Sequence, residues 1–322
     1  MPSPEIVDAM ALMRHQAFKR LVLYKDTQDA FLDQKKFIAH GINGAQNNGA
    51  IHVNHDGSAL RAFLMHWTEK DSWYGAETQN CVIHLQPNDP KALAWTEECL
   101  RREMPNFNSK FDLILDAAYE EVRLFFLNRR FHIDALILIG ETGIALQQLG
   151  PNKSSNATTK DLGLEIAPLT NDSHVEEISN LKQKVFSRNR GCWFALNPEF
   201  IKHEKEELLK SIAQNQPLYI IQSGDGTVGF FGAHIERSNT YWGDVGNLEF
   251  VLDCSLQGKG LARQLYRIVL QDLKSLAVTK FKGGTSNPAV LHLSKTMGRE
   301  LSATVIRKNP SSQKDFAPYI RS

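Results

Sequence analysis

The segment that decides the fold is Asn247–Leu265, NLEFVLDCSLQGKGLARQL, in a chain of 322 residues. It reads as an apolar strand, a short turn, a glycine-rich loop and a helix. Gly258 and Gly260 allow backbone N–H groups to approach a ligand closely, and the N-terminal end of the next helix carries a partial positive charge. Such a corner is suited to binding a phosphate or a pyrophosphate.

The glycine pattern alone leaves open a plain strand–helix turn that binds nothing, because short glycine motifs are common. Two known phosphate-binding motifs do not match this sequence. The P-loop pattern GxxxxGK[ST] is absent. The dinucleotide pattern GxGxxG requires a third glycine, and Gly258-Lys259-Gly260 is followed by Arg263 at that place.

The composition is that of a soluble globular protein, with 42% hydrophobic and 23% charged residues. The formal net charge of +1 argues against a nucleic-acid partner, since such proteins usually carry a basic excess. No apolar run is long enough to span a membrane, and the first residues do not resemble a signal peptide, so a cytoplasmic protein is expected. The four cysteines lack metal-ligand spacing, so neither a disulfide framework nor a metal site is predicted.

The chain reads as two unequal copies of one plan. The polar stretch 150–160 is the clearest linker. Two hairpin turn signals, Asp56-Gly57-Ser58 and Asp225-Gly226-Thr227, lie at nearly the same place in each half. We therefore predict a domain over 1–149, a linker over 150–160 and a second domain over 161–322.

The second half shows strand and helix patterns in a mixed α/β order, with a hairpin first and alternation afterwards. The expected strands cover 164–168, 218–222, 228–235, 248–252, 279–283 and 303–307, and the expected helices cover 171–186, 198–214, 258–277 and 288–299. The first half repeats this order but lacks the opening strand.

The decisive segment resembles motif A of the GNAT superfamily of acyl-CoA-dependent N-acyltransferases. The family pattern Arg/Gln-x-x-Gly-x-Gly/Ala is met by Gln257, Gly260 and Ala262. Downstream, 287–298 resembles the family's helix that begins at Asn and ends at Gly. The resemblance covers about 162–307 and implies a mixed-sheet GNAT fold, with two GNAT-like domains in tandem.

The resemblance also implies how acetyl-CoA, or another acyl-CoA, would bind. Backbone groups of the motif strand would meet the pantetheine arm, and one strand N–H would polarise the thioester carbonyl. The loop amides would hold the pyrophosphate, and the asparagine that starts the later helix would lie near the thiol end. The implied binding residues are Phe250, Val251, Leu252, Gln257, Gly258, Lys259, Gly260, Leu261, Ala262 and Asn287.

For catalysis, Glu249 is the best candidate for the base that removes a proton from the acceptor amine. A solvated carboxylate at the strand end is the alternative interpretation. The family often has a tyrosine as general acid, and the aligned position holds Ser294. The implied acceptor site includes four residues of the loop 187–197, where an aromatic surface loop is the alternative: Arg188, Arg190, Trp193 and Phe194.

The first half departs from the motif. Its aligned loop, 86–91, contains two prolines and no glycine, and proline lacks an amide donor. This half therefore resembles a degenerate GNAT domain that keeps the fold and lacks the cofactor loop.

The leading function is acetyl transfer from acetyl-CoA to the primary amine of a small molecule or peptide. A non-catalytic acyl-CoA-binding sensor or interaction module stays open, as does acyl transfer to a hydroxyl or lipid. The sequence names neither the acceptor nor the oligomeric state.

Overall fold

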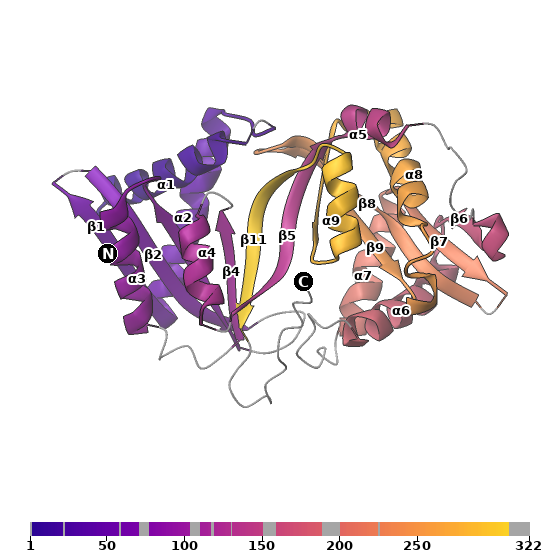
Figure 1. Ribbon diagram of the computed structural model, residues 1–322, viewed down its shortest axis with the longest axis horizontal. Coiled ribbons are helices and arrows are strands. Elements are labelled where there is room, and N and C mark those ends of the chain that lie inside the picture. The colour runs from indigo at the N-terminus through magenta and orange to yellow at the C-terminus, as the bar shows by residue number, and fades with distance from the viewer. Residues whose placement is uncertain are drawn as a thin grey trace. The chain divides into compact units, whose positions relative to one another are not determined.

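A computed structural model of the chain describes residues 2–21, 23–57, 59–70, 77–103, 110–116, 119–129, 131–150, 159–188, 200–224 and 226–308. The chain divides into two compact units. Unit 1 takes its described residues from 1–71, 75–137 and 301–322, and unit 2 takes its described residues from 138–300. Figure 1 shows the helices and strands of both.

Unit 2 is built on a mixed sheet with the strand order β5-β10-β9-β8-β7-β6. These strands are β5 (His132–Glu141, of which the part from Leu138 lies in this unit), β6 (Glu165–Pro168), β7 (Leu218–Ser223), β8 (Gly226–Asn239), β9 (Gly243–Leu252) and β10 (Lys280–Thr285). Neighbours from β6 to β9 pair antiparallel, whereas β9 and β10 run parallel.

Helices cover both faces of the unit 2 sheet. They are α5 (Thr142–Leu149), α6 (Val175–Arg188), α7 (Phe200–Ala213), α8 (Ala262–Ser275) and α9 (Pro288–Thr296). Helices α6 and α7 share a buried cluster with Phe230 and Val251, while α5 and α8 share another with Phe231 and Phe281. Because successive strand residues point to opposite faces, Phe230 and Phe231 serve different clusters.

Helix α8 connects the parallel strands β9 and β10, and its sequence explains why it forms there. Its buried residues recur at helical spacing, so one apolar stripe faces the sheet. They are Leu265, Tyr266, Val269, Leu270 and Leu273. The predicted helix started at 258, but α8 begins at Ala262, because Gly258 and Gly260 have φ values of +76° and +78° and cannot continue an α-helix.

Unit 1 repeats this order without the opening strand, as expected. Its elements are α1 (Pro4–Lys19), α2 (Gln28–Asn48), β1 (Gly49–Asp56), β2 (Ala59–Lys70), β3 (Glu77–Leu85), α3 (Pro90–Glu103), β4 (Lys110–Asp116), α4 (Glu120–Leu127), the start of β5, and β11 (Glu300–Lys308). Strand β3 runs parallel to β4, as β9 does to β10. Both predicted hairpins form, as β1–β2 and β7–β8.

The compact units do not follow the predicted boundary at 150–160. The end of β5 and all of α5 belong to unit 2, while β11 belongs to unit 1 from Leu301 onward. There β11 pairs antiparallel with β4, from Ala303 opposite Asp116 to Lys308 opposite Phe111. The last residues of each half of the sequence thus belong to the compact unit that the other half mainly forms. Local sequence patterns do not reveal this exchange.

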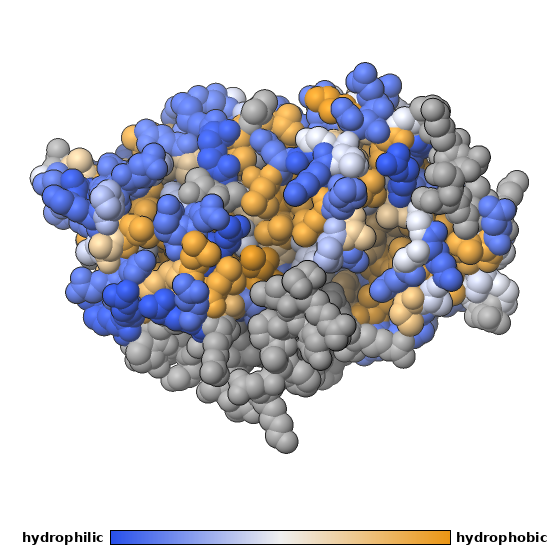
Figure 2. Space-filling view, in the orientation of Figure 1, coloured by the Kyte–Doolittle hydropathy of each residue, from blue (hydrophilic) through white to orange (hydrophobic). Residues whose placement is uncertain are grey.

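Within the described residues, no helix is long and apolar enough to cross a bilayer. Hydrophilic and apolar side chains are interspersed on the face drawn in Figure 2. In the part of the chain that the structure describes, the exposed large hydrophobic side chains are Leu12, Leu32, Ile114, Leu124, Ile144, Leu209 and Leu276.

A glycine on β8 provides a test of the sheet. A Cβ at Gly232 would lie 2.4 Å from the carbonyl oxygen of Pro217 and 2.8 Å from Cα of Leu218, both of them backbone atoms. We expect Gly232→Ala to force β7 and β8 apart and to lower the free energy of unfolding by about 1–3 kcal/mol. The midpoint of urea unfolding measures this. Gly224→Ala in the same hairpin is the control, since a Cβ there meets nothing within 4 Å; equal midpoints would contradict the expectation.

Candidate functional site

The predicted phosphate-binding loop lies at the carboxyl end of β9. A short 3₁₀ turn over Cys254–Leu256 leads into it. The Asp253 carboxylate accepts a hydrogen bond from the Ser255 N–H (3.0 Å) and forms an ion pair with Lys184 (2.6 Å). The start of the loop is thereby tied to its own backbone and to α6.

The loop presents several unused backbone donors. Among the described residues, the N–H groups of Gly258, Gly260, Leu261 and Ala262 have no backbone acceptor. The residue at the N-cap position of α8 is Leu261, whose side chain makes no capping hydrogen bond. A Cβ at Gly258 would meet no atom within 4 Å, so the outer side of the loop is open. These amides and the positive end of α8 fit a pyrophosphate.

The pairing between strands β9 and β10 ends beside this loop. Their register runs from Val245 opposite Lys280 to Asn247 opposite Lys282. Beyond Asn247, within the described residues, β9 continues to pair only with β8. The edge of Phe250–Leu252 that faces away from β8 therefore has no ladder partner, as a pantetheine arm would require.

Glu249 lies in this unpaired part of β9, inside a charged network. Its Oε1 is 2.8 Å from the Lys182 ammonium, and its Oε2 is 3.2 Å from Nε2 of His234. The same ammonium is 2.7 Å from Oε2 of Glu204. The Lys182 and Glu204 side chains are only 4% and 6% exposed, while that of Glu249 is 23% exposed. Of the three charged side chains, Glu249 is the one that solvent or a ligand can reach, and its partner His234 is also partly exposed, at 34%.

The network fixes the charges of Glu249 and Lys182. Burial alone would raise the pKa of Glu249, but the Lys182 charge and hydrogen bonds from His234 and Lys182 outweigh it and hold that pKa below its ordinary value. Burial alone would lower the pKa of Lys182, but Glu249 and Glu204 outweigh it and raise that pKa. Glu249 is thus an ionised carboxylate at neutral pH.

Three members of the network were not predicted as site residues from the sequence. Lys182 comes from α6, Glu204 from α7 and His234 from β8. Lys182 and Glu204 lie among charged or polar residues, and His234 lies in the apolar run of an expected strand, so nothing marked the three as one charged cluster. Only a charge falling on the apolar face of each helix could have signalled Lys182 and Glu204.

The structure argues against Ser294 as a proton donor. Its side chain is completely buried, and its Oγ accepts a hydrogen bond from the Arg299 guanidinium at 3.0 Å. Arg299 also donates to the carbonyl oxygens of Leu138 (2.7 Å) and Gly283 (3.0 Å). Ser294 therefore helps to hold an arginine that ties α9 to β5 and β10, and no ligand could reach its hydroxyl.

Asn287 forms the cap of α9. Its side chain accepts a hydrogen bond from the Ala289 N–H at 2.9 Å. The resemblance implied that Asn287 lies near the thiol end of acyl-CoA, and this placement stays a prediction. Of the predicted acceptor residues, Arg190, Trp193 and Phe194 lie outside the described residues, and Arg188 ends α6 with its side chain outside the description.

The corresponding corner of unit 1 is already filled. The Asp89 carboxylate accepts hydrogen bonds from the N–H groups of Lys91 (2.9 Å) and Ala92 (3.2 Å) at the start of α3. Pro90 contributes no donor. A carboxylate thus occupies the place that a phosphate would need.

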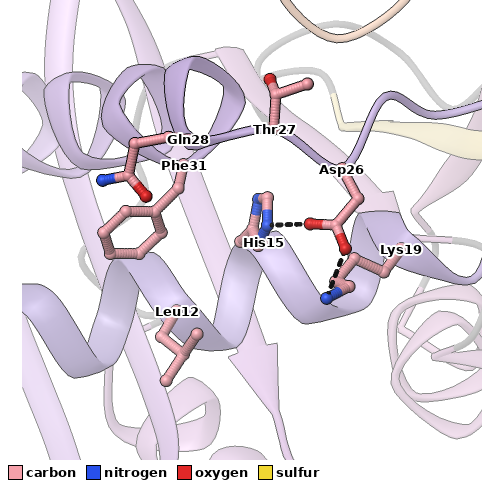
Figure 3. Close-up of a pocket in the computed structure, with 7 residues that line it drawn as sticks. All are labelled: Leu12, His15, Lys19, Asp26, Thr27, Gln28 and Phe31. Carbon is pink, nitrogen blue, oxygen red and sulfur yellow. Dashed lines mark hydrogen bonds and ion pairs between the residues drawn. The ribbon is translucent and has the colours of Figure 1, made fainter.

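Unit 1 has a pocket of its own between α1 and the start of α2 (Figure 3). His15 lines this pocket, 2.9 Å from Asp26 through Nε2 and 2.9 Å from the Tyr24 hydroxyl through Nδ1. Lys19 forms a second ion pair with Asp26. None of these residues belongs to the glycine-loop motif.

Comparison with known proteins supports the fold. No protein-family model matches the sequence, and no curated protein matches it. The structure is similar to a GCN5-related N-acetyltransferase from Sphaerobacter thermophilus, with a TM-score of 0.53 and 11% identity, over 95% of this chain and 93% of that one. It is also similar to a glucosamine N-acetyltransferase region in a fungal multi-domain GH3 β-N-acetylglucosaminidase, with a TM-score of 0.52 and 12% identity, over 96% of this chain and 37% of that one.

The class that these findings define is the GNAT acyltransferase fold. The chain carries it in a tandem arrangement of two mixed α/β units, which confirms the predicted fold class. At such low identity the likeness establishes the fold, while the reaction has to be argued from the site.

The buried ammonium of the network yields a prediction. Lys182→Met leaves Glu204 and Glu249 without their cation, and we expect it to lower the free energy of unfolding by about 3–5 kcal/mol at pH 7. Because the pKa of Glu249 is lowered in the folded protein, this stabilisation exists above its ordinary value of 4.5 and fades as pH falls. The gap between variant and wild-type urea midpoints should therefore be full above pH 4.5 and shrink as the pH falls below that value.

Lys184→Met is the matched control on the same helix. Its partner Asp253 is 2.6 Å away, but the Lys184 side chain is 48% exposed. The expected loss is below about 1 kcal/mol. Equal losses in the two variants would contradict the special position of Lys182.

Proposed function

We propose that this protein is an acyl-CoA-dependent N-acyltransferase that transfers an acetyl group to a primary amine. The observation that carries the proposal is the uncapped glycine loop at the start of α8, next to a β9 edge that has lost its ladder partner. The GNAT fold places both features in one unit and supports the same reaction class.

The chain's own residues suggest how the acyl donor would be held. The amides of Gly258, Gly260, Leu261 and Ala262 would bind the pyrophosphate, and the free edge of Phe250–Leu252 would bind the pantetheine. Gln257 and Lys259 flank these amides in the same loop. When bound, acyl-CoA supplies an activated thioester carbonyl.

Glu249 is the residue we assign to the acceptor amine. Attack by the amine forms a C–N bond and breaks the C–S bond, and the nitrogen must lose a proton. An ionised carboxylate that is 23% exposed can accept that proton directly or through water. Lys182 and His234 hold the carboxylate in place as positioning residues, since each contacts one of its oxygens.

A general acid is not required by this chemistry. The leaving group is a thiolate, and free thiols have a pKa of about 8.5, so it departs without prior protonation. The burial of Ser294 is therefore compatible with turnover. The acceptor we propose is a small molecule or peptide that carries a primary amine.

The first test is binding of acetyl-CoA by calorimetry. We expect one site per chain, because the corner of unit 1 is capped by Asp89. Gly260→Val should weaken binding by about tenfold or more, since a side chain at φ +78° strains the loop and intrudes on its amides. Gly57→Val introduces a similar strain at φ +61° in the β1–β2 hairpin of unit 1 and is the control. Two sites per chain, or equal effects in both variants, would refute this arrangement.

A non-catalytic acyl-CoA sensor is the second candidate, favoured by one observation. Both oxygens of Glu249 already have partners, Lys182 and His234, and Ser294 is buried. A sensor would bind acetyl-CoA and release no thiol with any amine.

Glu249→Gln separates the two candidates. For an enzyme, we expect unchanged acetyl-CoA affinity and a turnover reduced by about 10²–10⁴-fold, because the amide cannot accept the proton. Thiol release across a panel of primary amines measures the turnover. Glu206→Gln, at an exposed position of α7, is the control. Turnover that survives Glu249→Gln would exclude Glu249 as the base, and binding without turnover in the wild type would favour the sensor.

A further inference from the structure

Three potential metal ligands meet on one side of unit 1, far from the glycine motif in the sequence. His52 comes from β1, His66 from β2, and Glu103 is the last residue of α3. In the register of the hairpin, His66 faces Ala50 and His52 faces Leu64. The two histidines are therefore diagonal neighbours on one face of the β1–β2 hairpin, the face that α3 contacts (Figure 1).

The ligand atoms converge at distances suited to one ion. Nε2 of His52 is 3.1 Å from Oε1 of Glu103, and Nε2 of His66 is 3.5 Å from Oε2. All of the ligand atoms lie within 4.8 Å of one another. Zinc binds nitrogen and oxygen at about 2.0–2.2 Å in tetrahedral sites, which separates neighbouring ligands by about 3.3–3.5 Å.

The contacts of His52 with Glu103 do not amount to an ordinary hydrogen bond. Nε2 of His52 is buried and has no hydrogen-bond partner among the described residues, although the carboxylate is 3.1 Å away. When Arg102 turns away from Nδ1, the ring proton can move to Nδ1, which leaves a lone pair on Nε2 for a metal bound between the two side chains.

The surroundings of His66 also suit a ligand. Its Nδ1 is 2.9 Å from the Gln79 amide, which in turn contacts the Thr68 hydroxyl. The Gln79 amide has nearly the same shape after a half turn, which exchanges its nitrogen and oxygen. In that orientation, the oxygen accepts a hydrogen bond from Nδ1 of His66. A metal-binding histidine usually donates its second ring N–H to such an acceptor.

One neighbour opposes a cation. Nη2 of Arg102 is 3.0 Å from Nδ1 of His52, and its Nε is 3.0 Å from Oε1 of Glu103. The Arg102 side chain is 58% exposed, so it can turn into solvent when an ion binds. In favour of a cation, the C-terminal end of α3 contributes a partial negative charge.

We propose that His52, His66 and Glu103 form a binding site for a divalent transition metal, best matched by Zn²⁺, with a water completing the tetrahedron. Two imidazoles and one carboxylate are typical of sites that keep one open position. The partly buried side chains, which are 18%, 8% and 13% exposed, leave room for that fourth ligand from solvent. This proposal concerns unit 1 alone and does not depend on acyl transfer.

The test is Zn²⁺ titration of the full chain after removal of metals with a chelator. Cys254→Ser is the background, because that cysteine is exposed and could bind zinc on its own. We expect one Zn²⁺ per chain, and at least about tenfold weaker binding in His66→Gln and in Glu103→Gln. Co²⁺ as a second probe should show the intense visible absorption of a tetrahedral site with nitrogen and oxygen ligands.

Matched controls lie on the same elements. His55→Gln on β1 and Glu98→Gln on α3 change exposed residues and should leave the dissociation constant unchanged. Arg102→Gln removes the opposing charge and should tighten binding. If His66→Gln unfolds in the metal-free thermal melt, Glu103→Gln and Arg102→Gln carry the test. Equal Zn²⁺ affinity in these variants and their controls, or no stoichiometric binding, would overturn the proposal.

Discussion

The parallel pairing of β9 with β10 is the constraint on which the candidate site depends. Parallel neighbours cannot be joined by a tight turn, so the chain must cross over one face of the sheet, here through α8. The crossover brings the N-terminus of α8 to the carboxyl end of β9. An anion-binding corner is the direct result of this topology, and the glycines at 258 and 260 leave it open.

Unit 1 obeys the same constraint with a different outcome. Its parallel strands β3 and β4 are joined by α3, which creates the same kind of corner. There, Asp89 satisfies the amides of Lys91 and Ala92 from within the chain. Topology therefore supplies the corner in both units, and a few side chains decide whether a ligand can use it.

Local patterns in the sequence predicted several features that depend on neighbouring residues. The glycine loop, the cap at Asn287 and the two hairpins follow from conformational preferences that act over a few positions. The allocation of β11 to unit 1 and the partners of Glu249 depend on contacts between segments far apart in the chain. The contact of Ser294 with Arg299 is of the same kind, because that arginine also donates to carbonyls of β5 and β10.

The charges around Glu249 bear on the kind of acceptor that can approach it. Glu204 neutralises Lys182, so the three ionised groups together keep one negative charge, and Glu249 is the most exposed of them. A primary amine is largely an ammonium at neutral pH, since its pKa is about 10. The carboxylate can thus attract the acceptor as a cation before it accepts the proton. Had Lys182 lacked its second partner, it would have cancelled this attraction, which gives the buried Lys182–Glu204 pair a role beyond stability.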